Sequence, residues 1–119
     1  MQHNFDLIII GGGPSGINSG ISAHRAGINY CILEQGVLAN SIYNFPSQMT
    51  FFSTSLKLEI GNIPFISHTD KPTRKEALEY YRRIIQTYDM NLHYATCVNG
   101  MKSDSCGTYT IATSKGNYT

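Results

Sequence analysis

The chain has 119 residues, a length typical of one domain that leaves little room for a second. Nine Lys and Arg residues stand against eight Asp and Glu residues, so the formal net charge is +1. This balance provides no basic surface for nucleic acid or for an anionic membrane. We therefore expect small molecules or proteins as partners, with no nucleic acid and no membrane among them.

The sequence contains no segment that predicts membrane insertion or secretion. Its longest purely apolar run, residues 7–10, is far shorter than the roughly 20 residues that cross a bilayer. The preceding residues 1–6 have neither the cationic region nor the cleavage site of a secretory signal. We expect a cytoplasmic protein.

The cysteines and histidines form no redox or metal-binding pattern. Cys31, Cys97 and Cys106 are widely spaced without a C-x-x-C pair, which predicts neither a disulfide framework nor a redox dithiol. The histidines, of which His3 is the first, lack paired ligand spacing, so we expect no metal site. The sequence identifies no catalytic residue.

The first part of the chain predicts a strand, a helix and a second strand. Residues 5–10 are largely apolar and end at a glycine cluster, which suits a strand covered on both faces in a parallel sheet. Residues 14–26 show helical spacing, a proline in the first turn and Gly27 as a stop. Residues 30–34 predict the second strand. Together these segments predict a βαβ unit with a right-handed crossover.

The middle of the chain predicts a long connection and then a helix. Residues 36–70 contain Asn, Ser, Pro and aromatic residues without a sustained period. Because such long irregular connections in compact domains are usually functional, we expect a binding loop. Residues 74–88 predict an amphipathic helix that begins with a capping box of Thr73 and Glu76.

The end of the chain predicts short strands. Residues 92–98 and 108–113 are rich in β-formers, and a turn sequence S-K-G-N follows at 114–117. Only two residues remain after that turn, so we expect the chain to stop where a hairpin begins its return. Because proteins normally cover or pair such an edge, we interpret the chain as a fragment.

Three glycines between the first strand and the helix form the pattern G-x-G-x-x-G. Gly11 allows a tight turn, Gly13 lets a pyrophosphate approach the backbone, and Gly16 permits close packing of the helix. The helix N-terminus offers backbone N–H groups and a partial positive charge to the same anion. This pattern indicates a dinucleotide site.

Glu34 ends the second predicted strand, about twenty residues beyond the glycines. An acid at this place accepts hydrogen bonds from the two hydroxyls of an adenosine ribose and disfavours a 2′-phosphate. The glycines alone would equally suit a tight turn without a ligand. With the strand, the helix and the acid in register, dinucleotide binding is the favoured interpretation.

The strings I-I-I-G-G-G-P-S-G at 8–16 and L-E-Q-G at 33–36 resemble the first FAD motif of thioredoxin reductase-like flavoproteins. The strings at 41–46, 50–53 and 58–61, with 71–74 and 80–82, are similar to the bacillithiol disulfide reductase group within that superfamily. The resemblance covers nearly the whole chain and weakens after Val98. It implies an α/β fold, a Rossmann-like parallel sheet with an added β-meander, incomplete here, with residues 1–119 as the N-terminal part of an FAD-binding domain.

The resemblance also implies which residues hold the cofactor. The glycine turn and Glu34 would bind FAD, residues 44–46 would approach the flavin, and the backbone at 96–98 would approach adenine. The implied cofactor-binding residues are Gly11, Gly13, Pro14, Ser15, Gly16, Glu34, Gln35, Asn44, Phe45, Pro46, Cys97 and Val98.

One position departs from the group. Bacillithiol-type members often carry a cysteine immediately before the third glycine, where it has been proposed as the redox-active thiol, and this chain has Ser15. A serine there is expected to bond the pyrophosphate or to cap the helix. The identity of the thiol substrate therefore stays open.

The resemblance implies that the intact protein is an NADPH-dependent FAD oxidoreductase that reduces a low-molecular-weight disulfide. It further implies an NAD(P)H domain, a C-terminal return to the FAD domain, and a homodimer. Those segments lie outside these residues, so we expect the chain alone to be inactive. A flavin-containing monooxygenase and a non-catalytic domain that binds NAD rather than FAD stay open as alternatives. The long connection after Glu34 favours FAD, because a simple NAD domain usually continues with another helix and parallel strand.

Overall fold

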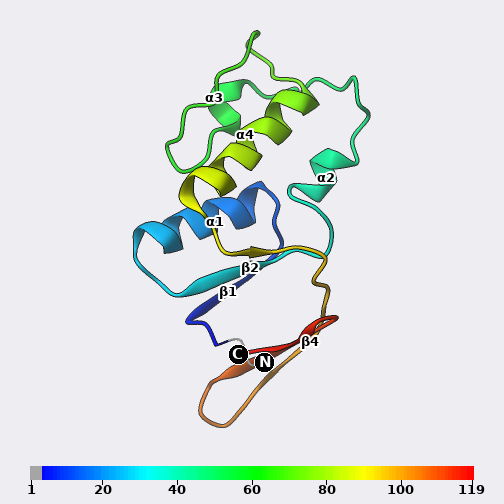
Figure 1. Ribbon diagram of the computed structural model, residues 1–119. Coiled ribbons are helices and arrows are strands. Elements are labelled where there is room, and N and C mark those ends of the chain that lie inside the picture. Colours follow the sequence, from blue (N-terminus) through cyan, green and yellow to red (C-terminus); the bar gives the residue numbers. More distant parts are fainter. Residues whose placement is uncertain (1–3) are drawn as a thin grey trace.

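Within the described part of the chain, the strands form two three-stranded sheets, one parallel and one antiparallel (Figure 1). The computed structural model describes residues 4–119, so His3 and the first half of the stretch considered for a secretory signal lie outside it. Helices α1 (Pro14–Arg25) and α4 (Arg74–Tyr88) lie on one side of the parallel sheet, and the antiparallel sheet lies on the other. This arrangement confirms the predicted α/β fold with an added β-meander.

The parallel sheet has the strand order β1 (Leu7–Ile10), β2 (Tyr30–Leu33), β3 (Leu92–His93). The predicted parallel pairing of β1 with β2 is confirmed. β1 packs on both faces as expected, with Ile9 against the cluster that contains Ile17 and Ile8 against the cluster that contains Tyr118. Among residues 4–119 it is nevertheless an edge strand, and Ile10 at its end is 57% exposed. β2 instead occupies the centre, with all of its residues buried.

Helix α1 packs against the sheet through Ile17 and Ile21, which are fully buried near Ile32 of β2. The helix begins at Pro14 and ends within one residue of the predicted boundary, because Gly27 turns the chain with a φ of +70°. No helix among the described residues is long and apolar enough to cross a bilayer.

The capping box of α4 forms as predicted. The Glu76 N–H donates to Thr73 Oγ1 (3.2 Å), and the Thr73 N–H donates to Glu76 Oε1 (3.0 Å). Two backbone donors that the first helical turn leaves without intrahelical partners are thereby satisfied.

The connection between β2 and α4 is long but anchored. It contains two short helices, α2 (Asn40–Tyr43) and α3 (Ser55–Leu58), and α4 holds it through Tyr80. The Tyr80 hydroxyl accepts from the Ile60 N–H (3.0 Å) and donates to the Ile63 carbonyl (2.7 Å). Phe65 stacks on the Tyr80 ring with centroids 4.4 Å apart. The segment is therefore tied to the helix that follows it.

The predicted strand at residues 92–98 is interrupted. β3 ends at His93, Ala95 has a φ of 49°, and a separate strand β4 (Val98–Ser103) begins the antiparallel sheet. The left-handed backbone at Ala95 breaks the extended conformation. The chain thereby leaves one sheet and enters the other.

The expectation that the final hairpin lacks its returning strand is wrong. β5 (Tyr109–Thr113) pairs with β6 (Gly116–Tyr118), because a short turn and a φ of 112° at Gly116 reverse the chain at once. Tyr118 is buried and packs with Cys31 and Leu33 of β2. The interpretation of the chain as a fragment therefore cannot rest on an unpaired hairpin.

The capping box predicts a specific stability effect. Thr73→Ala removes the side-chain acceptor at the start of α4 and should lower the free energy of unfolding by about 1 kcal/mol. Thr87→Ala, at an exposed position of the same helix, is the matched control and should not lower it, because Ala favours helix. Urea denaturation of both variants measures the difference, and equal effects would contradict the capping role.

Candidate dinucleotide-binding site

The three glycines of the turn between β1 and α1 are required for different steric reasons. Gly11 has a φ of +109°, which favours glycine strongly. A Cβ at Gly16 would lie 1.9 Å from the Gly11 carbonyl oxygen, so the helix could not approach the turn. A Cβ at Gly13 would meet no atom within 4 Å. A Cβ at Gly11 would likewise meet no atom, but its positive φ already requires glycine, whereas Gly13 has a φ of −82° and borders open space, which leaves its backbone accessible to a ligand.

Glu34 lies immediately after β2 and is only 6% exposed. The Gly12 N–H donates to its Oε1 (2.9 Å), and the Gly36 N–H donates to its Oε2 (2.6 Å). The carboxylate thus joins the glycine turn to the segment that follows β2. Because each carboxylate oxygen can accept more than one hydrogen bond, ribose hydroxyls can still bind. The bonds to Gly12 and Gly36 were missed from the sequence, although glycines at both places allow the backbone to come close.

A small cavity of ≈ 130 Å³ lies between the glycine turn and α2. Its polar lining includes the sequence-predicted residues Glu34 and Gln35, and the N–H of Ala39 donates to the Gly12 carbonyl (2.9 Å), which fixes α2 beside the turn. Pockets for whole ligands are usually about 300 Å³ or larger, so this cavity fits part of a dinucleotide. Its lining residues are Gly13, Pro14, Glu34, Gln35, Ala39, Asn40, Ser41 and Ile42.

Asn40 and Ser41 of this lining were not predicted from the sequence. They lie in the irregular connection, where no periodic pattern marks them. Their position within a few residues of Glu34 was the one available signal.

The remaining predicted residues do not line this cavity, although some contact residues that do. The Cys97 thiol donates to Gln35 Oε1 (3.8 Å), so the start of β4 lies beside the end of β2. Asn44 follows α2 and donates through its side chain to the Asn40 carbonyl (2.8 Å). Phe45 and Pro46 continue beyond α2 and do not line the cavity, and Phe45 contacts Phe51 edge to face.

Ser15 does not cap helix α1. The N-cap residue is Gly13, and no side chain of residues 4–119 caps that end of the helix. Ser15 is exposed in the first turn, and its carbonyl accepts from the Ser19 hydroxyl (3.0 Å). The predicted capping role is therefore wrong, and bonding to a pyrophosphate stays a prediction.

The cysteines are all unpaired thiols. Cys31 is fully buried in β2, and burial raises its pKa to about 12. Because the thiolate is the reactive form, Cys31 is inert near neutral pH. Cys106 is exposed on the β4–β5 hairpin. Among residues 4–119, no group of three or more His, Cys, Asp or Glu side chains is arranged to hold a metal ion.

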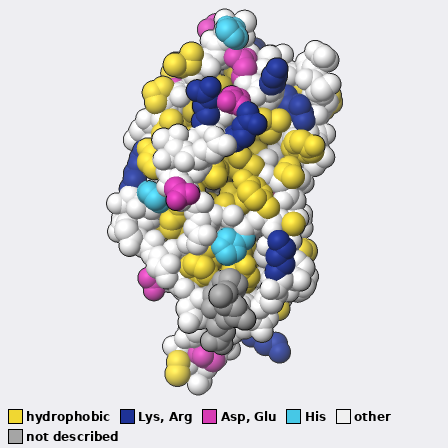
Figure 2. Space-filling view, viewed as in Figure 1, with side chains coloured by type: hydrophobic (Ala, Val, Ile, Leu, Met, Phe, Trp, Pro, Cys, Tyr) yellow, Lys and Arg dark blue, Asp and Glu magenta, His cyan; other side chains and the backbone are white. Residues whose placement is uncertain are grey.

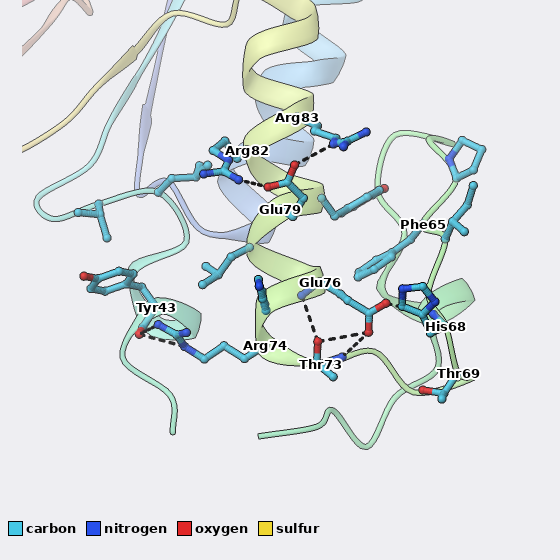
Figure 3. A pocket seen from close by; sticks show the side chains of 17 residues that line it. Tyr43, Phe65, His68, Thr69, Thr73, Arg74, Glu76, Glu79, Arg82 and Arg83 are labelled. Carbon is cyan, nitrogen blue, oxygen red and sulfur yellow. Dashed lines mark hydrogen bonds and ion pairs between the residues drawn. The ribbon is translucent and has the colours of Figure 1, made fainter. Parts of the chain in front are cut away.

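A larger cavity of ≈ 1250 Å³ lies along α4 (Figure 3). Its cations are largely engaged with neighbouring groups. Arg82 and Arg83 both pair with Glu79, the latter at 2.9 Å. Arg74 donates to the Tyr43 carbonyl (2.6 Å) and covers the Tyr43 ring. In Figure 2, basic, acidic and apolar side chains are mixed over the upper part of the molecule, where Figure 1 shows α3 and α4. The cavity is thus no strongly charged site, and Arg74 acts by holding the end of α2.

Comparison with protein families identifies the group to which this arrangement belongs. The family model described as "Pyridine nucleotide-disulphide oxidoreductase" matches residues 8–119. The chain belongs to the pyridine nucleotide-disulphide oxidoreductase family. The match includes the glycine turn, Glu34 and both sheets, so it covers the whole candidate site.

Individual members of the family are similar along nearly the whole chain. Bacilliredoxin reductase Bdr from Bacillus subtilis (strain 168) is 42% identical over 112 residues, which cover 94% of this chain and 35% of that protein. The structure of bacillithiol disulfide reductase Bdr from Staphylococcus aureus superposes with a TM-score of 0.93 at 40% identity, covering 98% of this chain and 36% of that one. The chain therefore spans about a third of the length of these relatives.

A flavin-containing monooxygenase from Stenotrophomonas maltophilia shares the fold. Its structure superposes with a TM-score of 0.90 over 98% of this chain and 36% of that one, but the identity is only 23%. At that identity the likeness shows a common architecture and carries no statement about activity.

The glycine geometry predicts opposite stabilities for two similar substitutions. Gly16→Ala places a methyl group against the Gly11 carbonyl and should lower the free energy of unfolding by about 1–3 kcal/mol. Gly13→Ala meets no atom within 4 Å and should change it by less than about 1 kcal/mol, because loss of glycine freedom in the unfolded chain offsets a poorer N-cap. Urea denaturation compares them, and equal destabilisation would refute the assignment of Gly16 to close packing.

Proposed function

We propose that the intact protein is an FAD-dependent oxidoreductase that takes reducing equivalents from NADPH and reduces a low-molecular-weight disulfide. In this proposal, residues 1–119 hold the adenosine and pyrophosphate part of FAD. The observation that carries the proposal is the open backbone of Gly13 beside the buried carboxylate of Glu34. This geometry accompanies 42% identity to a bacilliredoxin reductase.

The residues present fit a dinucleotide. Gly13 leaves room for an anion to reach the backbone, and helix α1 directs its positive N-terminal end to the same place. Glu34 supplies carboxylate oxygens for the ribose, held in place by Gly12 and Gly36. No lysine or arginine is needed to balance the pyrophosphate.

The chain's contribution to the flavin end is positional. Bound FAD would supply the hydride chemistry, and the protein would supply binding and orientation. Residues 44–46 follow α2, and Arg74 holds the end of that helix through the Ile42 and Tyr43 carbonyls (3.2 and 2.6 Å). Arg74 would therefore position the segment proposed to approach the flavin.

Ser15 limits the thiol chemistry available to this part of the protein. A serine hydroxyl cannot undergo thiol–disulfide exchange, because that reaction requires a thiolate. Cys31 is buried with a raised pKa, so it does not substitute for a reactive thiol at the site. Electron transfer to the disulfide would then use the flavin directly or groups other than Ser15 and Cys31.

The rest of the proposed enzyme lies outside residues 1–119. We propose an NAD(P)H domain, a C-terminal segment that completes the FAD domain, a homodimer and a cytoplasmic location. The chain spans 35% of its bacilliredoxin reductase relative, which leaves length for these parts in a protein of that size. The exposed outer edge of β1 supports a completing segment, because apolar edge strands are normally paired or covered.

The identities favour the disulfide reductase over the monooxygenase. The reductases are 40–42% identical to this chain, whereas the monooxygenase is 23% identical. Only a cofactor measurement separates the flavoenzyme from the alternative of a non-catalytic domain that binds NAD.

A glycine pair tests the cofactor site directly. Titrating FAD into the full-length apoprotein should give binding in the wild type and at least about tenfold weaker binding in Gly13→Ala, because a Cβ would keep the pyrophosphate from the backbone. Gly100→Ala is the matched control, since a Cβ there also meets no atom within 4 Å and the residue lies on β4. Unchanged affinity in Gly13→Ala would refute the pyrophosphate site, and wild-type binding of NAD but not FAD would favour the non-catalytic alternative.

A further inference from the structure

Tyr94 continues the parallel register of β2 and β3 beyond its last ladder pair. Leu33 pairs with His93, so the next facing residues are Glu34 and Tyr94. The Glu34 N–H donates to the His93 carbonyl (2.9 Å). In a parallel pair, a residue donates to the carbonyl of the residue just before its facing partner, so this bond agrees with Tyr94 as the partner of Glu34. Facing residues of adjacent strands direct their side chains to the same face of a sheet. Tyr94 therefore lies beside Glu34, on the face that carries α1.

Three hydrogen bonds hold the backbone at Tyr94 and Ala95. Its carbonyl accepts from Thr96 Oγ1 (2.9 Å) and from Lys115 Nζ (3.0 Å). The following residue, Ala95, donates to the Gly36 carbonyl (3.3 Å). These contacts fix the residue at the junction of β2, β3 and the β5–β6 turn, so its side chain projects from a defined backbone.

The Tyr94 side chain is available to a ligand. It is 41% exposed, and its hydroxyl makes no hydrogen bond within the described part of the chain. Burial and the neighbouring Glu34 carboxylate raise the pKa of the Tyr94 hydroxyl, which agrees with the closeness of the two groups.

The direction of a bound dinucleotide follows from the strand order. The pyrophosphate would lie at the turn between β1 and α1, and the ribose would lie at Glu34 after β2. Because the adenine is attached to the ribose on the side away from the pyrophosphate, it would extend toward β3. The strand order β1-β2-β3 therefore places the base over the end of β3, where Tyr94 lies.

We propose that the ring of Tyr94 is the platform on which the adenine of the cofactor packs. This inference rests on the proposed function. It adds to the proposed site a residue that would determine the preference for an adenine dinucleotide. Aromatic rings suit this role, because they provide a flat apolar surface with little conformational entropy to lose. Glu34 would hold the ribose by hydrogen bonds, and Tyr94 would hold the base by stacking.

The test compares FAD affinities of full-length apoprotein variants by quenching of flavin fluorescence. Tyr94→Ala and Tyr94→Leu should each weaken FAD binding about tenfold, which corresponds to about 1.4 kcal/mol, because neither offers a ring face. Tyr94→Phe keeps the ring and should stay within about twofold of the wild type. Tyr109→Ala is the control, because it removes an exposed tyrosine from β5.

The outcomes separate this inference from the proposed function. Wild-type protein that fails to bind FAD would overturn the proposed function before any variant is compared. Wild-type binding with unchanged affinity in Tyr94→Leu and Tyr94→Ala would overturn the platform alone. A loss in Tyr94→Phe equal to that in Tyr94→Ala would also overturn it, since it would assign the effect to the hydroxyl. Urea midpoints of the apoproteins, expected to agree, exclude a folding defect as the cause.

Discussion

The buried carboxylate of Glu34 joins the parts of the structure that would contact a dinucleotide. Its two oxygens accept from Gly12 in the glycine turn and from Gly36 in the segment after β2. Its own backbone bonds to His93 and Thr96 on the other side. Removing one partner of such a buried charged group is costly, because the remaining groups lose their hydrogen bonds without gaining water. The turn, the second strand and the crossover to the antiparallel sheet thus depend on one side chain.

The rest of the described chain supports this junction from two sides. Helix α4 holds the long connection through Tyr80 and holds the end of α2 through Arg74, so the residues that line the small cavity are fixed by a helix that lies outside it. On the opposite face, Tyr118 closes the antiparallel sheet over Cys31 and Leu33. The central strand β2 is consequently buried between two layers. Because Glu34 directly follows β2, its carboxylate is held in a buried position.

The sequence predicted most where local chemistry decides the structure. The extents of α1 and α4, the capping box at Thr73 and the turn at Gly11 all follow from glycine, proline and apolar spacing within one element. The sequence did not predict the features that depend on contacts between distant parts of the chain. The left-handed residue Ala95 and the exposed edge of β1 depend on how strands from different parts of the chain meet. The position of Asn40 and Ser41 in the cavity lining likewise depends on how α2 packs beside the glycine turn, and no periodic pattern in the sequence predicts that packing.

The central claim is that the junction at Glu34 and the glycine turn binds FAD. The most direct measurement is to reconstitute the full-length protein with FAD and NAD together, remove free ligand by desalting, denature the protein and identify the released cofactor by chromatography. The account predicts FAD in near-stoichiometric amount with respect to the protein. Release of NAD alone, or of no dinucleotide from folded protein, would contradict it.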